Sequence, residues 1–221
     1  MVRDDPARPD PGFAELYASL PDATDLEPWL TWCRRAQPPV LYLGVGSGRL
    51  AMPLARAGVE IVGVDAHPGM LERLRARLPE AALVEGLIEE LDLGRRFDLV
   101  MAPSNILTTP ARLGSAARHS DLRVAFELLN PHWLLAGASR GVQIRSLSEE
   151  LADIEVDYPG GWRQAARVPL IWPENVESML EEAQLELELM RGSTEEGSLA
   201  GSASYYVLAR TKAGSLSSDG P

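Results

Sequence analysis

Three glycines at alternate positions, Gly44, Gly46 and Gly48, follow the short apolar run VLYL and precede RLAMPLARA, which has the composition of a helix. A turn without side chains lets a ligand lie against the main chain, beside the positive end of the helix. Asp65 ends the next apolar run, 17 residues after Gly48, where a carboxylate can accept hydrogen bonds from both hydroxyls of a ribose. A glycine turn and an acid at adjacent strand ends predict a nucleoside-binding crevice.

The spacing of these glycines separates two kinds of nucleoside cofactor. Dinucleotide-binding folds carry G-x-G-x-x-G, whose third glycine allows close packing of helix on strand. Here the spacing is G-x-G-x-G, and Arg49 stands where that third glycine would be. The pattern therefore disfavours a nicotinamide oxidoreductase. It resembles motif I of the class I S-adenosylmethionine (SAM)-dependent methyltransferases.

The resemblance covers residues 13–211 and is closest to small-molecule methyltransferases of the sugar-amine and natural-product type. LPEAALVEGLIEELDLGRRFDLVMAPSN is similar to the family's acidic loop and fourth strand, and MLEEAQLELELM with YYVLART is similar to its closing helix and strands. The resemblance implies SAM as the cofactor and S-adenosylhomocysteine (SAH) as the product. The cofactor-binding residues that it implies are Tyr17, Gly44, Gly46, Gly48, Asp65, Ala66, Met70, Gly86, Leu87, Ile88, Ala102 and Pro103.

Two positions depart from the family pattern. Tyr42 stands in the first strand where the family usually has Asp or Glu, and Leu87 stands where it usually has an Asp that contacts adenine. The first change removes a carboxylate near the methionine amino group, and the second removes an adenine hydrogen bond. Asp65 and main-chain groups remain to bind the cofactor.

Methyl transfer depends mainly on alignment of the reactants and sometimes on removal of a proton, so the family has no universal catalytic residue. His132, in the Asn-Pro-His-Trp loop after the fifth strand, is the candidate general base because the pKa of histidine lies near neutrality. A solvated loop histidine is the alternative. Asn105 is the candidate for orienting the acceptor or the methyl donor, and a turn-forming role is its alternative. We expect His67 at the rim of the cofactor site.

Aromatic residues are concentrated in the segments that cover the substrate in relatives of this family. We predict that they form walls of the acceptor pocket and can contact a sulfonium by cation–π attraction, with ordinary core packing as the alternative. The predicted substrate-binding residues are Trp29, Trp133, Tyr158 and Trp172. With three histidines and the single Cys33, which we interpret as structural, a His/Cys metal cluster is not expected, and no metal site is predicted.

Apolar runs alternate with helical patterns along the chain, as in βαβ units with a parallel sheet. Strands are predicted at 40–43, 59–64, 81–84 and 97–101, with helices at 48–57 and 68–78. The next stretch has two interpretations: a helix at 110–119 with a strand at 122–128, or one long helix over 111–129. We favour the first because RVAFEL is rich in β-forming residues and Asn-Pro ends it.

The remaining segments complete one domain, 1–211, followed by a disordered tail at 212–221. Residues 1–11 are rich in Pro and Asp and are predicted to be disordered; helices at 12–20 and 25–36 form an N-terminal lid. Residues 139–172 form a small antiparallel β insertion after the fifth strand. Pro173 then opens a helix, and two strands close the sheet. The predicted fold is α/β: a Rossmann-like, seven-stranded, mostly parallel sheet with helices on both faces.

Composition limits the partners. The net charge of −11 argues against a nucleic-acid backbone, and no apolar run is long enough for a membrane span or a signal peptide. We therefore expect a cytoplasmic monomer or homodimer with a small-molecule substrate. Two other functions stay open: a SAM-dependent cyclisation or elimination on the same fold, and a non-catalytic SAM-binding partner subunit.

Overall fold

The main sheet has seven strands, as predicted. The computed structural model describes residues 1–3, 8–137, 141–194 and 196–212, and the predicted tail lies outside these residues apart from Lys212. The strand order is β10-β11-β6-β5-β2-β3-β4, and β11 runs antiparallel to both of its neighbours while the other contacts are parallel. The strands are β2 Val40–Leu43, β3 Ile61–Asp65, β4 Ala82–Glu85, β5 Phe97–Ala102, β6 Ser120–Leu129, β10 Leu185–Gly192 and β11 Ser204–Thr211.

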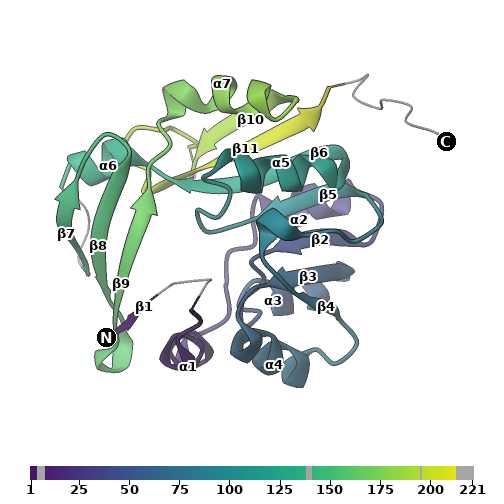
Figure 1. Ribbon diagram of the computed structural model, residues 1–221, viewed down its shortest axis with the longest axis horizontal. Coiled ribbons are helices and arrows are strands. Elements are labelled where there is room, and N and C mark those ends of the chain that lie inside the picture. The colour runs from purple at the N-terminus through teal and green to yellow at the C-terminus, as the bar shows by residue number, and fades with distance from the viewer. Residues whose placement is uncertain (4–7, 138–140, 195, 213–221) are drawn as a thin grey trace.

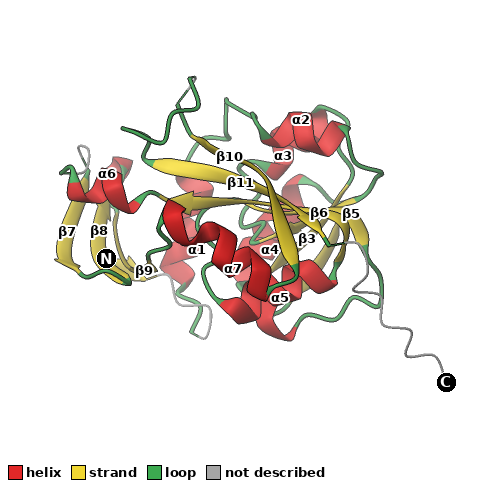
Figure 2. Cartoon of the chain, turned by 90° about the horizontal axis from the view of Figure 1, so that it is seen from above, coloured by secondary structure: helices red, strands yellow, loops and turns green. Residues whose placement is uncertain are grey.

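Helices cover both faces of this sheet, so that its central parallel strands β2 and β5 are buried on both sides. α2 (Trp29–Arg34), α3 (Ala51–Arg56) and α4 (Pro68–Arg77) pack on one face. α5 (Pro110–Arg118) and α7 (Val176–Glu182) pack on the other. Figure 2 shows α2 and α3 on the opposite side of the sheet from α5 and α7. The two apolar layers fix the strand ends on which the site is built.

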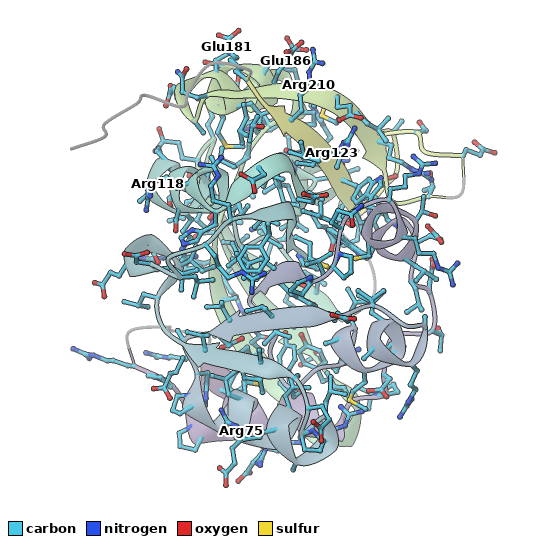
Figure 3. All side chains as sticks on the ribbon, turned by 90° about the vertical axis from the view of Figure 1, so that its right-hand side faces the viewer. Arg75, Arg118, Arg123, Glu181, Glu186 and Arg210 are labelled. Carbon is cyan, nitrogen blue, oxygen red and sulfur yellow. The ribbon has the colours of Figure 1, made fainter. Side chains whose placement is uncertain are left out.

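The helix at 110–119 and the strand at 122–128 are confirmed as separate elements, with α5 ending at Arg118 and β6 running from Ser120 to Leu129. The Thr109 hydroxyl accepts a hydrogen bond from the main-chain N–H of Arg112 and so caps α5, while Pro110 occupies its first turn. Charged residues mark the edge of the sheet at β10. Arg210 on β11 pairs there with Glu186 on β10 at 2.8 Å (Figure 3). Charged pairs of this kind keep an exposed edge from pairing with other chains.

The predicted antiparallel insertion is a second, smaller sheet. It contains β7 (Val142–Leu147), β8 (Leu151–Asp157) and β9 (Arg163–Pro169), each antiparallel to the next. The short helix α6 (Pro131–Leu135) connects β6 to it. Figure 1 shows this sheet standing beside the main one, with α1 (Pro11–Ser19) below the space between them.

Alternation along β8 and β9 gives the insertion two different faces. Ile154 and Val156 on β8, with Ala166 and Val168 on β9, face the main sheet. Charged residues at the alternate positions form ion pairs across the strands, such as Arg163 with Asp157 at 2.7 Å. The apolar residues of β8 and β9 thus form one wall of a cavity.

Two expectations for the N-terminal region are wrong. Residues 1–11 were predicted to be disordered, but β1 (Val2–Arg3) pairs in parallel with β9 and Asp10 caps α1 (Pro11–Ser19). The second predicted helix, α2, does not belong to a lid: Trp29 packs edge-on against Trp32, and both lie buried beneath the sheet. Of the predicted 12–36 lid, α1 alone lies over the cavity described below.

Candidate active site

A cavity opens at the carboxyl ends of β2, β3 and β4, beside the point where the chain order reverses between β2 and β5. Open α/β sheets bind their ligands at this place. The cavity holds about 1030 Å³ of space not filled by atoms, including space open to solvent. Nine of the predicted cofactor residues line it: Tyr17, Gly44, Gly46, Asp65, Ala66, Met70, Gly86, Leu87 and Ile88.

The glycine turn forms one wall of this cavity. Gly44 and Gly46 have φ of +69° and +57°, values that side chains disfavour. A Cβ on Gly46 would meet no atom within 4 Å, so it would project into the cavity itself. Gly48 has a different role, because a Cβ there would lie 2.4 Å from a methyl of Leu74. Gly48 therefore lets α4 approach the turn and does not line the cavity.

Asp65 stands at the end of β3 and is half-buried. One carboxylate oxygen accepts a hydrogen bond from the main-chain N–H of Gly46 and the other from that of His67, both at 2.8 Å. Burial raises the pKa of Asp65 above its usual value, and the main-chain hydrogen bonds oppose this only in part. Each oxygen keeps a further lone pair that can accept a hydroxyl hydrogen bond from a ligand.

Helix α1 closes the cavity from the other side. Phe13 and Tyr17 both line it, with ring centroids 4.6 Å apart. His67 also lines it and is buried; its Nε2 lies 2.9 Å from the carbonyl oxygen of Asp10. Nδ1 of His67 is buried without a hydrogen-bond partner among the described residues. His67 thus lies at the cavity, as predicted, and its ring connects the start of α1 to the end of β3.

The end of β5 differs from the prediction. Ala102 and Pro103 are buried and do not line the cavity, whereas Ser104, Asn105 and Ile106 do. Ser104 and Asn105 have φ of +73° and +58°, a region that side chains other than glycine rarely occupy. Such strain persists only where surrounding contacts hold it.

Hydrogen bonds hold this turn in place. The main-chain N–H of Ser104 donates to the Glu127 carboxylate at 3.2 Å, and that of Asn105 donates to the Glu127 carbonyl at 3.0 Å. The side chain of Asn105 accepts from the N–H of Leu129 at 2.8 Å and donates to the carbonyl of Pro169 at 3.4 Å. Asn105 therefore ties the end of β6 to β9 of the insertion.

A second cavity lies between this turn and the inner face of the insertion. It shares Tyr17, Ser104, Asn105 and Arg112 with the first, so the two cavities meet. The insertion contributes mainly apolar side chains, together with Tyr158, whose hydroxyl donates to Gln164 at 2.9 Å. Of the four predicted substrate-binding aromatics, Tyr158 is the one that lines this cavity.

The structure does not bring His132 to either cavity, so its predicted position facing the cofactor is wrong. Asn130 caps α6, and the His132 ring turns outward to lie 2.8 Å from the carboxylate of Glu174. Its side chain is 50% exposed. Trp172 packs edge-on against this ring and donates to the carbonyl of Glu149, also away from both cavities.

Trp29 and Trp133 pack in apolar clusters, which was the alternative interpretation for the aromatic residues. Trp29 belongs to the buried cluster under the main sheet. Trp133 packs beside Leu134 and Leu170 between α6 and the insertion. Cys33 is likewise buried, and burial raises the pKa of its thiol to about 12, as suits a structural cysteine.

Several cavity residues were not predicted. Arg112 on α5 pairs with Glu89 at 2.7 Å, and both line the first cavity. Glu89 lies in the segment that resembles the acidic loop of the family, so the sequence indicated that this segment is near the site. Arg112 reaches the site through the packing of α5, which the sequence pattern does not indicate. Phe13 lay one helical turn before Tyr17, and that spacing was a usable signal.

The two departures from the family pattern have clear surroundings. Leu87 lines the first cavity as an apolar wall. The side chain of Tyr42, on the central strand β2, is buried; burial, followed by the nearby carboxylates of Glu127 and Asp65, raises the pKa of its phenol. Tyr42 therefore remains a neutral side chain.

Comparison with known proteins agrees with this geometry. A sequence model described as a methyltransferase domain matches residues 40–126, which span the glycine turn, Asp65 and β5. A ubiquinone biosynthesis O-methyltransferase from Azorhizobium caulinodans is 31% identical over 167 residues, which are 73% of this chain and 60% of that protein. The match thus spans less than two thirds of the relative.

Two solved structures share the fold over most of their length. The CcbJ methyltransferase from Streptomyces caelestis superimposes with a TM-score of 0.62 and 25% identity, covering 95% of this chain and 93% of that one. A SAM-dependent methyltransferase from Clostridium acetobutylicum gives a TM-score of 0.70 at 14% identity, covering 90% and 98%. Among the described residues, no helix has the length and apolar character needed to cross a membrane.

Proposed function

We propose that this chain is a class I SAM-dependent methyltransferase and that it transfers a methyl group from SAM to a small molecule. The observation that carries the proposal is the meeting of two cavities at Tyr17, Ser104 and Asn105. The first cavity has the features of a nucleoside site, and the second has room for an acceptor. A transfer between two bound molecules needs this arrangement.

The residues that line the first cavity match the chemical groups of SAM. Asp65 offers acceptor lone pairs to the ribose hydroxyls, and Gly46 leaves the main chain open beside the ligand. Met70, Leu87 and Ile88 provide apolar surface for the adenine ring. Nδ1 of His67 has no hydrogen-bond partner among the described residues, so a ligand can form a hydrogen bond with it. When bound, SAM supplies an electrophilic methyl group on a positively charged sulfur.

The chain's own contribution is alignment and exclusion of water. The strained turn at Ser104 and Asn105 forms the common boundary of the two cavities, and its hydrogen bonds hold it rigid. The apolar inner face of the insertion covers the acceptor side. A concave pocket with a wall of apolar side chains suits a small molecule, such as an intermediate of natural-product biosynthesis.

Calorimetric titration of the purified protein with SAH, SAM and NADH tests the cofactor. We expect SAH and SAM to bind and NADH not to bind. Incubation with SAM and a set of small acceptors then tests the transfer, because each methylated product gains the mass of one CH₂ group. A protein that binds NADH, or that binds neither SAM nor SAH, would contradict the proposal.

A further inference from the structure

We propose that the acceptor is an amine with an apolar body, and that its ammonium group is bound by the carboxylate of Glu127. The inference rests on the proposed function and names the substrate class of the same site. Glu127 lies near the end of β6 and lines the second cavity, not the first. It is the one acidic side chain among the residues that line this cavity in the described part of the chain.

The position of Glu127 is fixed by neutral groups. One carboxylate oxygen accepts a hydrogen bond from the Ser204 hydroxyl at 2.6 Å, and the other accepts one from the main-chain N–H of Ser104 at 3.2 Å. Within the described residues, none of the ion pairs includes Glu127. A half-buried carboxylate held by neutral donors is oriented, yet its charge is not balanced.

The basic residues of the same cavity are already engaged elsewhere. Arg112 pairs with Glu89 at 2.7 Å, and Arg167 pairs with Asp153 at 2.8 Å. Glu127 therefore carries the unbalanced charge among the side chains that line the cavity. Removing a carboxylate from water costs free energy unless a cation compensates it. A bound ammonium group would supply that compensation.

The remaining walls indicate what the ammonium is attached to. Ile154, Val156, Ala166 and Val168 line the cavity from the insertion, facing the turn at Ser104. They provide an apolar surface for a hydrocarbon body. An amphipathic amine would thus place its nitrogen beside Glu127, close to the boundary between the cavities.

The reaction balances for such an acceptor. After one proton leaves the ammonium nitrogen for the Glu127 carboxylate and then water, the nitrogen lone pair forms a bond to the methyl carbon. The carbon–sulfur bond breaks, and its electron pair stays on sulfur. The products are a methylated ammonium ion, SAH and one proton, so the two positive charges of the reactants are accounted for.

The test uses the full chain saturated with SAH, titrated calorimetrically with 2-phenylethylamine, cyclohexylmethylamine and 2-benzylpyrrolidine. Each amine is matched by an uncharged analogue of the same shape: 2-phenylethanol, cyclohexylmethanol and 2-benzyltetrahydrofuran. We expect the amines to bind at least about tenfold more tightly than their analogues, as for a charge-assisted hydrogen bond. E127Q should abolish this preference and leave SAH affinity within about twofold.

The matched control is E174Q, which removes the same charge from an exposed carboxylate outside both cavities. It should retain the preference for amines. Equal binding of amines and analogues, or binding of none of the amines, overturns the inference. So does an E127Q variant that loses SAH affinity, because Glu127 would then serve the cofactor. Failure of SAH to bind the unaltered protein would instead contradict the proposed function.

Discussion

The carboxylate of Asp65 accepts a hydrogen bond of 2.8 Å from the main-chain N–H of Gly46. The acid at one strand end therefore holds the glycine turn of the neighbouring strand, and the two features that indicate a nucleoside site depend on each other. A change at either residue alters both the wall of the cavity and its polar anchor. Variants at these two positions therefore need matched controls that separate fold stability from ligand affinity.

Gly46→Ala is expected to abolish SAH binding and to lower stability no more than a glycine change outside the cavity does. The new methyl group would project into the cavity, and the residue would keep a φ near +57° at a cost of about 1–2 kcal/mol. Gly58→Ala is the matched control, because Gly58 has a φ of +88° and equally open surroundings but does not line the cavity. Denaturant unfolding should show similar losses for both variants, whereas calorimetry should show lost affinity for Gly46→Ala alone. Equal SAH affinity in the two variants would contradict this assignment.

Asp65→Ala should weaken SAH binding by about 1–3 kcal/mol, since hydrogen bonds to a charged acceptor are lost. Calorimetric titration measures the change, and circular dichroism checks that the fold is kept. The matched control is Asp92→Ala, at an exposed acid that accepts a hydrogen bond from the main-chain N–H of Gly94 in a loop outside the cavity. If Asp65→Ala binds SAH as tightly as the unaltered chain, Asp65 does not hold the ribose.

The affinity for SAH should fall with decreasing pH. Burial raises the pKa of Asp65, so this carboxylate takes up a proton at a higher pH than an exposed aspartate does. The protonated group has lost acceptor capacity, so binding is strongest above the raised pKa and weakens as pH falls through it. The same shift means that the charged form costs folding free energy near neutral pH, and that protonation relieves this cost. Titrations over a pH series should show the loss in the unaltered chain and a smaller dependence in Asp65→Ala.

Much of the fold was predictable because local patterns and long-range packing agree in the core. The apolar runs before Gly44 and Asp65 are strands buried on both faces, and glycine and proline mark their ends. Strand β1 could not be predicted, because two residues gain a strand conformation only by pairing with β9, far away in the sequence. The lid assigned to α2 failed for a related reason: an amphipathic pattern shows that a helix has a buried face, but not which surface covers it.

The candidate site shows the same division. The nucleoside cavity follows from main-chain geometry that glycine and aspartate impose locally, and nine predicted residues line it. The acceptor side depends on where side chains point after β5 and β6, which a linear pattern does not record. Glu127 and Asn105 meet there because the main-chain N–H of Asn105, in the turn after β5, donates to the carbonyl of Glu127 on β6.

Asn105→Ala should loosen the connection between the main sheet and the insertion. The N–H of Leu129 would lose its acceptor at 2.8 Å, which is expected to cost about 1–3 kcal/mol of unfolding free energy. Hydrogen exchange at the Leu129 amide, measured by NMR, should become faster. Asn105→Asp keeps an oxygen acceptor and should preserve this protection. Unchanged exchange in Asn105→Ala would show that Asn105 does not hold β6.

His132→Ala should leave SAH affinity and turnover unchanged, contrary to the role that the sequence position of His132 predicts. Its ring lies 2.8 Å from Glu174 on exposed surface, and it lines neither cavity. A general base must come within hydrogen-bond reach of the proton that it removes, directly or through one water. The control is Glu127→Gln, at the carboxylate that does line the acceptor cavity, and its turnover of an amine should fall. A large loss of turnover in His132→Ala, with SAH affinity kept, would instead require α6 to move its histidine into the acceptor cavity during the reaction.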